Sequence, residues 1–332
     1  MKDIMAGAPY SMYVDRINQK LYAVYAVGTR TNVIDLNTLT ICKRLTGFRY
    51  IIKILFIHKF GWVFLATNND ECWLLNIDDY SVVHRFKYRI LDPYVCFDEV
   101  SDKIYVFGTI GIDNGVSVID LKTLTIENYC FPRIIDEKRR RLSFYSPHKC
   151  AGEDLYLLNC SYDILPTSTE NIETIYGKYR LSKDGLQLID TIYTGNEDIE
   201  FAKGNDDYML SSMRGLMYRV KENDVIDYGA KIGELYYRFF ISDKYIYFWE
   251  WFSDKIIRTT VDFDSVETVF TKGFGEKVTS YAESEKYRFV AVSKCDEYNE
   301  RGVLQYNVTK SRIMVFDKNE EMKSSAICMK GR

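Results

Sequence analysis

The stretch "VIDLNTLT" at residues 33–40 returns almost unchanged as "VIDLKTLT" at residues 118–125. A third version, "LLNIDDYSVV" at residues 74–83, keeps the same order of apolar residues followed by a polar turn. Self-similarity at a regular spacing is the signature of repeat architectures. The stretch therefore marks a repeating structural unit, and the rest of the chain can be searched for further copies.

Seven copies of the pattern can be aligned along the chain. The equivalent positions are Asp35, Asn76, Asp120, Arg180, Arg219, Asp262 and Asn307. A second pattern precedes each copy by about a dozen residues, as in "NQKLYAVYA" (18–26), "SDKIYVFGT" (101–109) and "SDKYIYFWE" (242–250). A polar turn followed by an apolar, aromatic-rich run predicts a buried strand after a tight turn. No segment shows a sustained helical period, so we expect few helices.

Each unit therefore contains four short strands, and units of this length and content are typical of β-propeller blades. We predict an all-β chain that folds as one seven-bladed β-propeller of four-stranded antiparallel blades. The approximate blade boundaries are 10–46, 47–88, 92–131, 141–194, 197–231, 234–272 and 276–317, with a C-terminal tail at 318–332. An eighth blade that includes "KSSAICMKGR" (323–332) is the alternative. The segment "MKDIMAGAPY" (1–10) either adds a strand to the last blade or trails over the surface.

The segment "KLYAVYAVGTRTNVIDLNTLTICKRL" (20–45) resembles the YVTN-type repeat of WD-like β-propeller proteins. The resemblance is good in the first and third units, partial in the second and sixth, and weak in the others. The Trp-Asp dipeptide of WD repeats is absent, which disfavours that subfamily. The resemblance implies a propeller fold that acts by binding proteins or ligands, and it carries no catalytic residues.

The aspartates of the repeated stretch have two interpretations. Asp35, Asp120 and Asp262 could be metal ligands, or they could end a strand and hold the following turn through hydrogen bonds to backbone groups. We favour the structural role, because these residues belong to separate blades and would lie far apart.

Composition places the chain among globular proteins with a large core. Hydrophobic residues make up 47% and aromatic residues 15%, and the formal net charge is −3. We expect no nucleic-acid partner, because a concentrated positive field is missing. The first residues lack a signal-peptide pattern and no apolar run is long enough to span a membrane, so we expect a cytoplasmic protein. The 8 cysteines contain no C-x-x-C pair, and we expect reduced, mostly buried thiols.

The loop face of a propeller, around its central channel, is where ligands usually bind. The residues expected there, together with those of two irregular loops, are Tyr10, Arg49, Tyr50, Asp92, Tyr94, Arg139, Arg141, Glu200, Tyr236, Trp251 and Lys277. Such a tyrosine-rich set suits a peptide, a sugar or a planar ligand, although tyrosines also pack between blades with their hydroxyls at the rim.

Four segments interrupt the repeat: 131–141, 160–173, 250–254 and 294–302. The first carries Lys138 and Arg139–Arg141, which could bind an acidic partner or a phosphate. The second is the longest insertion within a unit and could cover the channel. The third would expose Trp251 and Phe252, and the alternative is a buried Trp249 with only one exposed ring. The fourth adds Asp296 and Glu297.

Signals for catalysis are weak. The 3 histidines, His58, His84 and His148, do not converge on one place in the repeat, and no nucleophile elbow or phosphate-binding loop is present. We predict a non-catalytic scaffold or binding propeller that holds a protein, peptide or small ligand, with no catalytic residues and no cofactor. One alternative is a lyase or hydrolase with Ca²⁺ or Mg²⁺ held by Asp92, Glu200, Asp296 or Glu297. A carbohydrate-binding module is the second alternative.

Overall fold

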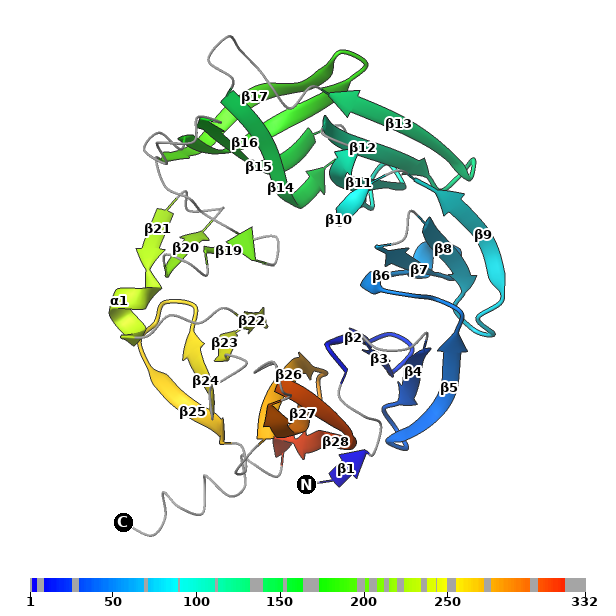
Figure 1. Ribbon diagram of the computed structural model, residues 1–332, viewed down its shortest axis with the longest axis vertical. Coiled ribbons are helices and arrows are strands. Elements are labelled where there is room, and N and C mark those ends of the chain that lie inside the picture. Colours follow the sequence, from blue (N-terminus) through cyan, green and yellow to red (C-terminus); the bar gives the residue numbers. More distant parts are fainter. Residues whose placement is uncertain are drawn as a thin grey trace. The chain divides into compact units, whose positions relative to one another are not determined.

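The fold is described from a computed structural model of the chain, shown in Figure 1. The structure describes residues 2–4, 9–25, 30–68, 71–88, 90–110, 113–131, 140–151, 154–163, 173–195, 201–202, 208–211, 215–219, 224–233, 238–242, 244–249, 255–271, 276–298 and 304–319. These residues form two compact units, one from residues 1–50 and 238–332 and the other from residues 51–237. Each unit is built from four-stranded antiparallel sheets.

The first unit contains three sheets. Their strand orders are β2-β3-β4-β5, β22-β23-β24-β25 and β1-β28-β27-β26. The strands are β1 (Lys2–Ile4), β2 (Ser11–Asp15), β3 (Lys20–Val24), β4 (Arg30–Asp35), β5 (Thr40–Thr46), β22 (Arg238–Ile241), β23 (Tyr245–Trp249), β24 (Lys255–Thr260), β25 (Val266–Thr271), β26 (Glu276–Glu283), β27 (Tyr287–Tyr298) and β28 (Leu304–Asp317).

The second unit contains four sheets with consecutive strand order, β6 to β9, β10 to β13, β14 to β17 and β18 to β21. The strands are β6 (Ile51–Ile57), β7 (Trp62–Thr67), β8 (Glu71–Asn76), β9 (Val82–Lys87), β10 (Leu91–Asp98), β11 (Lys103–Ile110), β12 (Asp113–Asp120), β13 (Thr125–Phe131), β14 (Arg140–Ala151), β15 (Asp154–Asp163), β16 (Glu173–Ser182), β17 (Gly185–Gly195), β18 (Phe201–Ala202), β19 (Tyr208–Ser211), β20 (Leu216–Arg219) and β21 (Asp224–Asp227).

The expectation of few helices is confirmed in the described part of the chain. A 3₁₀ turn, η1 (His58–Phe60), joins β6 to β7, and a short α-helix, α1 (Tyr228–Ile232), follows β21. The Asp227 side chain accepts a hydrogen bond from the Ala230 amide at the start of α1, and Gly233 ends the helix in the left-handed conformation. No described helix is long and apolar enough to cross a membrane.

The repeated aspartate ends the third strand of its sheet, as the sequence predicts. Asp35 Oδ1 accepts hydrogen bonds from the amides of Asn37 (2.9 Å) and Thr38 (3.1 Å), and Asp120 Oδ1 does the same for Lys122 and Thr123. A carboxylate at this position satisfies amides that the tight turn leaves unpaired. Hydrogen bonds from these backbone amides lower the pKa of Asp120. The hydrogen bond from Lys20 lowers the pKa of Asp35.

Strand register corrects two of the seven equivalent positions. Lys20 pairs with Asp35, and in the same register Tyr245 pairs with Thr260 and Tyr287 with Asp317. Thr260 and Asp317, rather than Asp262 and Asn307, therefore end the third strands of these sheets. For Asn307 the error has a physical origin, because β28 is 14 residues long and its first half, "LQYNVTK", resembles the repeated stretch.

The last sheet takes its fourth strand from the beginning of the chain. β1 pairs with β28 in an antiparallel register in which Ile4 faces Ile313. Ile4 is buried in a core cluster with Leu21 and Ile34 of one sheet and Phe289 of the other. The first of the two alternatives for residues 1–10 is thus confirmed, and residues far apart in sequence complete one sheet.

The hydrophobic core lies between the faces of neighbouring sheets. In the second unit, one cluster joins Phe64 and Leu74 to Val106 and Ile119, and another joins Phe107 to Leu155 of the following sheet. A four-stranded sheet cannot bury both of its faces alone, so successive sheets cover each other. The fourth strands are more exposed than the second strands, since each forms an edge of its sheet.

The prediction about the cysteines is wrong in part. Cys96, on β10, is disulfide-bonded, and the free thiols of Cys42 and Cys130 are exposed, whereas that of Cys72 is buried. Cys42 and Cys130 lie on fourth strands, where many side chains face solvent. The sequence contains no local cysteine pair, so a bridge between distant cysteines arises only when the strands come together.

A buried aspartate links two sheets of the second unit. Asp102, in the turn before β11, accepts hydrogen bonds of 2.7 Å from Lys59 Nζ of η1, and Lys122 Nζ lies 3.1 Å from its Oδ2. The Asp102 carboxylate is buried, while both lysine side chains are about 60% exposed. The hydrogen bond from Lys59, reinforced by Lys122, lowers the pKa of Asp102.

Asp102→Asn should reduce stability in a pH-dependent way. Because the pKa of Asp102 is lower in the folded state, the stabilisation is complete above the unfolded-state pKa of about 4 and is lost as the pH falls through the folded-state value. Urea unfolding should therefore separate the wild type from Asp102→Asn at pH 7 and less so near pH 3. Glu99→Gln, an exposed carboxylate of the same turn, is the control. An equal separation at both pH values would contradict the ion-pair role.

Candidate functional site

Two of the predicted binding residues lie at the starts of neighbouring strands of the first unit, β2 and β26. Tyr10 directly precedes β2, and its amide donates a hydrogen bond of 2.9 Å to the Val24 carbonyl. Lys277 is half-buried near the start of β26, the strand beside β2. A buried hydrogen bond of 2.9 Å from Thr279 Oγ1 to the Pro9 carbonyl holds these strand starts together. Burial, with a contribution from Tyr13, raises the pKa of the Tyr10 hydroxyl above its usual value.

Arg49 and Tyr50 form the end of the loop that follows β5. Both residues are exposed, and 58% of the Tyr50 surface is accessible to solvent. Tyr50 also has a positive φ of 52°. The other described non-glycine residues with positive φ are Gln19, Leu39, Tyr80, Asp102, Leu124 and Phe263. All six lie in tight turns between consecutive strands of one sheet, so Tyr50 is the exception.

In the second unit, three predicted residues fall on two adjacent first strands. Asp92 and Tyr94 are on β10, Arg141 is on β14, and these strands lie side by side. Tyr94 is 38% exposed, whereas for Asp92 and Arg141 the structure describes the backbone alone. The strand placement thus agrees with a shared location for these residues, which stays a prediction.

The remaining predicted residues lie outside the described part of the chain: Arg139, Glu200, Tyr236 and Trp251. The same is true of 132–139, 164–172, 250–254 and 299–303, which make up most of the four irregular segments. Asp296 and Glu297 lie on β27, where the structure describes their backbone. Trp249 is buried, in agreement with one of the two alternatives for this segment.

The described residues contain no group of three or more His, Cys, Asp or Glu side chains that could hold a metal ion. Carboxylates near the strand ends instead bind groups of the protein itself. Asp15 accepts hydrogen bonds from the amides of Ile17 and Asn18, and Asp98 from the amide of Val100. The proposed metal ligands Asp92, Glu200, Asp296 and Glu297 have side chains outside the described set, so that hypothesis stays a prediction.

A buried carboxylate at the end of β26, that of Glu283, is the centre of a polar cluster in the first unit. Glu283 Oε1 accepts a hydrogen bond of 3.1 Å from the Tyr247 hydroxyl of the adjacent sheet. Arg288 Nε lies 3.3 Å and Lys318 Nζ 2.9 Å from the same oxygen. The Glu283 side chain is 5% exposed. We call these four residues the Glu283 cluster.

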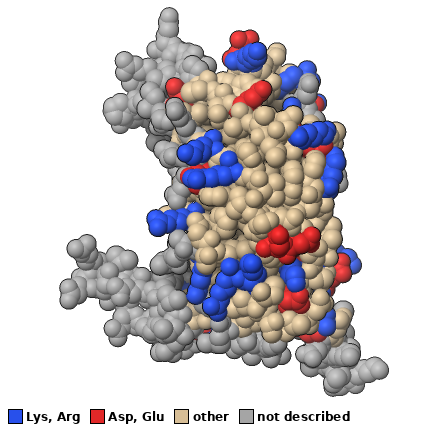
Figure 2. Space-filling model, turned by 90° about the vertical axis from the view of Figure 1, so that its right-hand side faces the viewer, with Lys and Arg blue, Asp and Glu red and all other residues tan. Residues whose placement is uncertain are grey.

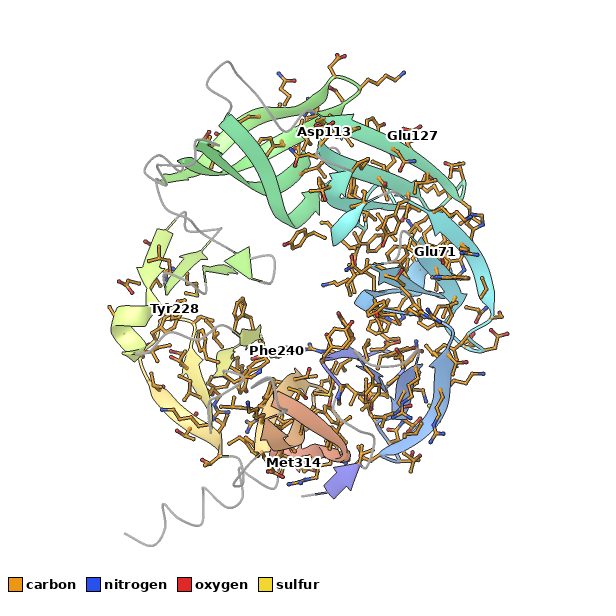
Figure 3. The ribbon with its side chains drawn as sticks, viewed as in Figure 1. Glu71, Asp113, Glu127, Tyr228, Phe240 and Met314 are labelled. Carbon is orange, nitrogen blue, oxygen red and sulfur yellow. The ribbon has the colours of Figure 1, made fainter. Side chains whose placement is uncertain are left out.

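Aromatic rings surround the Glu283 cluster. Tyr281 stacks on Tyr247 with ring centroids 4.8 Å apart, and Trp249 and Phe240 lie within 6.0 Å of Tyr281. Figure 3 labels Phe240 on β22, beside the sheet of Met314. Burial, followed by the charge of Glu283, raises the pKa values of Tyr247 and Tyr281. Tyrosines packed in this way join the two sheets.

Sequence reasoning missed the Glu283 cluster. Its signal was the alternation in "YIYFW" (245–249), which places Tyr245, Tyr247 and Trp249 on one face of β23. On the face drawn in Figure 2, Lys and Arg are interspersed with Asp and Glu, with uncharged surface between them. That face reflects the near-neutral composition of the chain.

Comparison of the structure with solved proteins shows a clear likeness. The β-propeller domain of Cps50 (Swd1) from Myceliophteria thermophila matches with a TM-score of 0.59 and 11% identity, over 96% of this chain and 99% of that one. The fold is propeller-like. Dihydro-heme d1 dehydrogenase NirN, in complex with DHE, matches with a TM-score of 0.55 and 10% identity, over 93% of this chain and 72% of that one.

Hydrazine synthase from Kuenenia stuttgartiensis gives a TM-score of 0.52 at 15% identity, over 76% of this chain and 84% of that one. No protein-family model matches the sequence, and neither does any curated protein. At these identities the likeness shows the propeller-like fold alone. Two of the three matched proteins are enzymes by name, and a shared fold does not determine function.

Proposed function

We propose that the seven sheets are the blades of one seven-bladed β-propeller and that the chain is a non-catalytic binding protein. It would hold a protein, a peptide or a small ligand through the loops that lead into the first strands. A carbohydrate ligand is an alternative. The match over 96% of the chain to a β-propeller domain supports the architecture. The unusual state of Tyr50 supports the binding role.

Tyr50 supports the binding role because it combines a left-handed backbone with a largely exposed aromatic side chain. A left-handed non-glycine residue costs about 1–3 kcal/mol and tends to mark functional sites. Hairpin geometry explains the other positive φ values, but Tyr50 is in the loop that joins β5 to β6, which belong to different sheets. An exposed tyrosine beside an arginine is a common anchor in protein interfaces, since both residue types are enriched among energetic hot spots. Arg49 and Tyr50 therefore form the proposed anchor.

Site-specific photo-crosslinking tests the anchor. A photoreactive phenylalanine analogue at Tyr50 should crosslink one defined partner in native extract, and Arg49→Glu should lower the yield about tenfold, as for the loss of a hot-spot residue. The same analogue at Ile17, which is 70% exposed in the turn between β2 and β3, is the control. Equal yields from the two sites would contradict the anchor.

A melting temperature raised by Ca²⁺ or Mg²⁺, and no longer raised in Asp92→Ala, would favour the metal-dependent enzyme instead.

A further inference from the structure

The fourth strand of a blade is an exposed edge, and most of the long edges in this chain are protected. An open edge presents unpaired backbone groups that can pair with another chain. Irregular pairing bends an edge away from such contacts. Register shifts interrupt the pairing of β5 with β4, β9 with β8, β17 with β16 and β25 with β24.

β13 lacks this protection. Its residues Thr125–Phe131 pair with β12 over their whole length without a register shift. No described strand pairs with its other edge. Most of its side chains are exposed, and it contains no proline or lysine, two residues that commonly guard an edge. The remaining fourth strands, β1 and β21, have only 3 and 4 residues.

The charge pattern of β13 suits a second copy of the same strand. The C-terminal end, Phe131, is buried against Leu155 and Tyr179 of the following sheet, which leaves Ile126–Cys130 for pairing. An antiparallel pair across a two-fold axis would be centred on Asn128. Glu127 would then face Tyr129 of the second copy, and no like charges would meet.

A two-fold, antiparallel pairing of two copies of the same strand is unfavourable at other edges. Pairing two copies of β5 about its midpoint would set Lys43 against itself, and pairing two copies of β17 would set Asp190 against itself. Like charges directly opposite each other destabilise a strand pair. Glu127 and Tyr129 are compatible groups, because within β13 the Tyr129 hydroxyl already donates a hydrogen bond of 2.6 Å to Glu127 Oε2. β13 thus combines a regular edge with a self-complementary sequence.

We propose that β13 is an interaction surface at which two copies of this chain pair, edge to edge and antiparallel, with Asn128 on the two-fold axis. The two four-stranded sheets then form one continuous sheet, and the contact is of the isologous type that closed dimers use. A single strand pair buries little surface, so the dimer is weak and populated at high protein concentration.

Disulfide trapping tests the register. Opposed residues in antiparallel strands have Cα atoms about 4.5–5.5 Å apart, within the range that a disulfide spans. Asn128→Cys, in a Cys42→Ser/Cys130→Ser background, should give a covalent dimer in a glutathione redox buffer. The two thiols lose two protons and two electrons to oxidised glutathione, which becomes two molecules of reduced glutathione. Lys43→Cys at the midpoint of β5, in the same background, is the matched control, and trapping should be at least about tenfold slower there.

Sedimentation velocity on the chain without introduced cysteines provides the second measurement. A dimer should form at concentrations of roughly 100 µM, and Asn128→Lys should abolish it by placing two lysines opposite each other. Equal trapping at Asn128→Cys and Lys43→Cys would overturn the proposal, as would a dimer that Asn128→Lys leaves intact. Protection of β13 amides from hydrogen exchange by a different protein, with the chain itself monomeric, would assign the edge to that partner and equally overturn it.

Discussion

Glu283→Ala should lower the free energy of unfolding by about 3–5 kcal/mol, the effect expected when one partner of a buried ion pair is removed. The substitution leaves Arg288 and the Tyr247 hydroxyl without their shared acceptor in a region shielded from water. Arg288 is 12% and Lys318 24% exposed, so water replaces the lost carboxylate incompletely. Denaturant unfolding at pH 7, followed by tryptophan fluorescence, measures the change.

The adjacent turn supplies a matched control for Glu283. Glu285 is exposed two residues away, and Glu285→Ala should change the stability by less than about 0.5 kcal/mol. Glu283→Gln should fall between the two, because the amide oxygen still accepts from Tyr247 but carries no charge for Arg288 and Lys318. Equal stabilities of Glu283→Ala and Glu285→Ala would show that the Glu283 cluster does not hold the two sheets together.

Ile4→Asp should destabilise the chain by about 3–5 kcal/mol, because it removes a buried apolar side chain and places a carboxylate in its site. Ile4 is 7% exposed and is the residue through which β1 enters the core. Loss of β1 also uncovers the edge of β28, where Ile313, Met314 and Val315 are buried. We therefore expect faster aggregation as well as a lower melting temperature.

Ile17→Asp is the appropriate control for Ile4→Asp, since the same substitution is made at a side chain that is 70% exposed. Its stability should stay within about 0.5 kcal/mol of the wild type. If Ile4→Asp behaved like this control, β1 would contribute nothing to the last sheet, and the pairing with β28 would have to form without energetic consequence. Circular dichroism melts measure the melting temperature, and light scattering measures the rate of aggregation.

Local sequence patterns were sufficient to predict the strands and turns. "VIDLNTLT" and "VIDLKTLT" each gave the end of a third strand, a turn held by an aspartate and the start of a fourth strand. The physics of these features is local, because a carboxylate reaches amides two and three residues away and alternating apolar residues define a strand face. The same reasoning misplaced Asp262 and Asn307, because the pairing register rather than turn chemistry decides the alignment there.

The candidate site was predicted less completely. Tyr10 and Lys277 were expected around the channel mouth, and the structure places them beside two neighbouring first strands, while their role in binding stays a prediction. The exposure of Tyr50 and its left-handed backbone could not be read from "GFRY" (47–50), because no local residue demands that conformation. The bond at Cys96 was likewise hidden, since the sequence contains no nearby cysteine pair.

The sequence by itself determined the repeating unit: four strands, tight turns, and the apolar, aromatic-rich second strand that becomes buried in each sheet. These properties depend on hydrogen bonds and side-chain directions within a few residues. Tertiary structure alone decided which strand completes the last sheet, which carboxylate is buried among cations, and which edge stays regular and open. Those outcomes depend on contacts between residues up to about 310 positions apart, such as Ile4 with Ile313, and on pairing registers that no local pattern specifies.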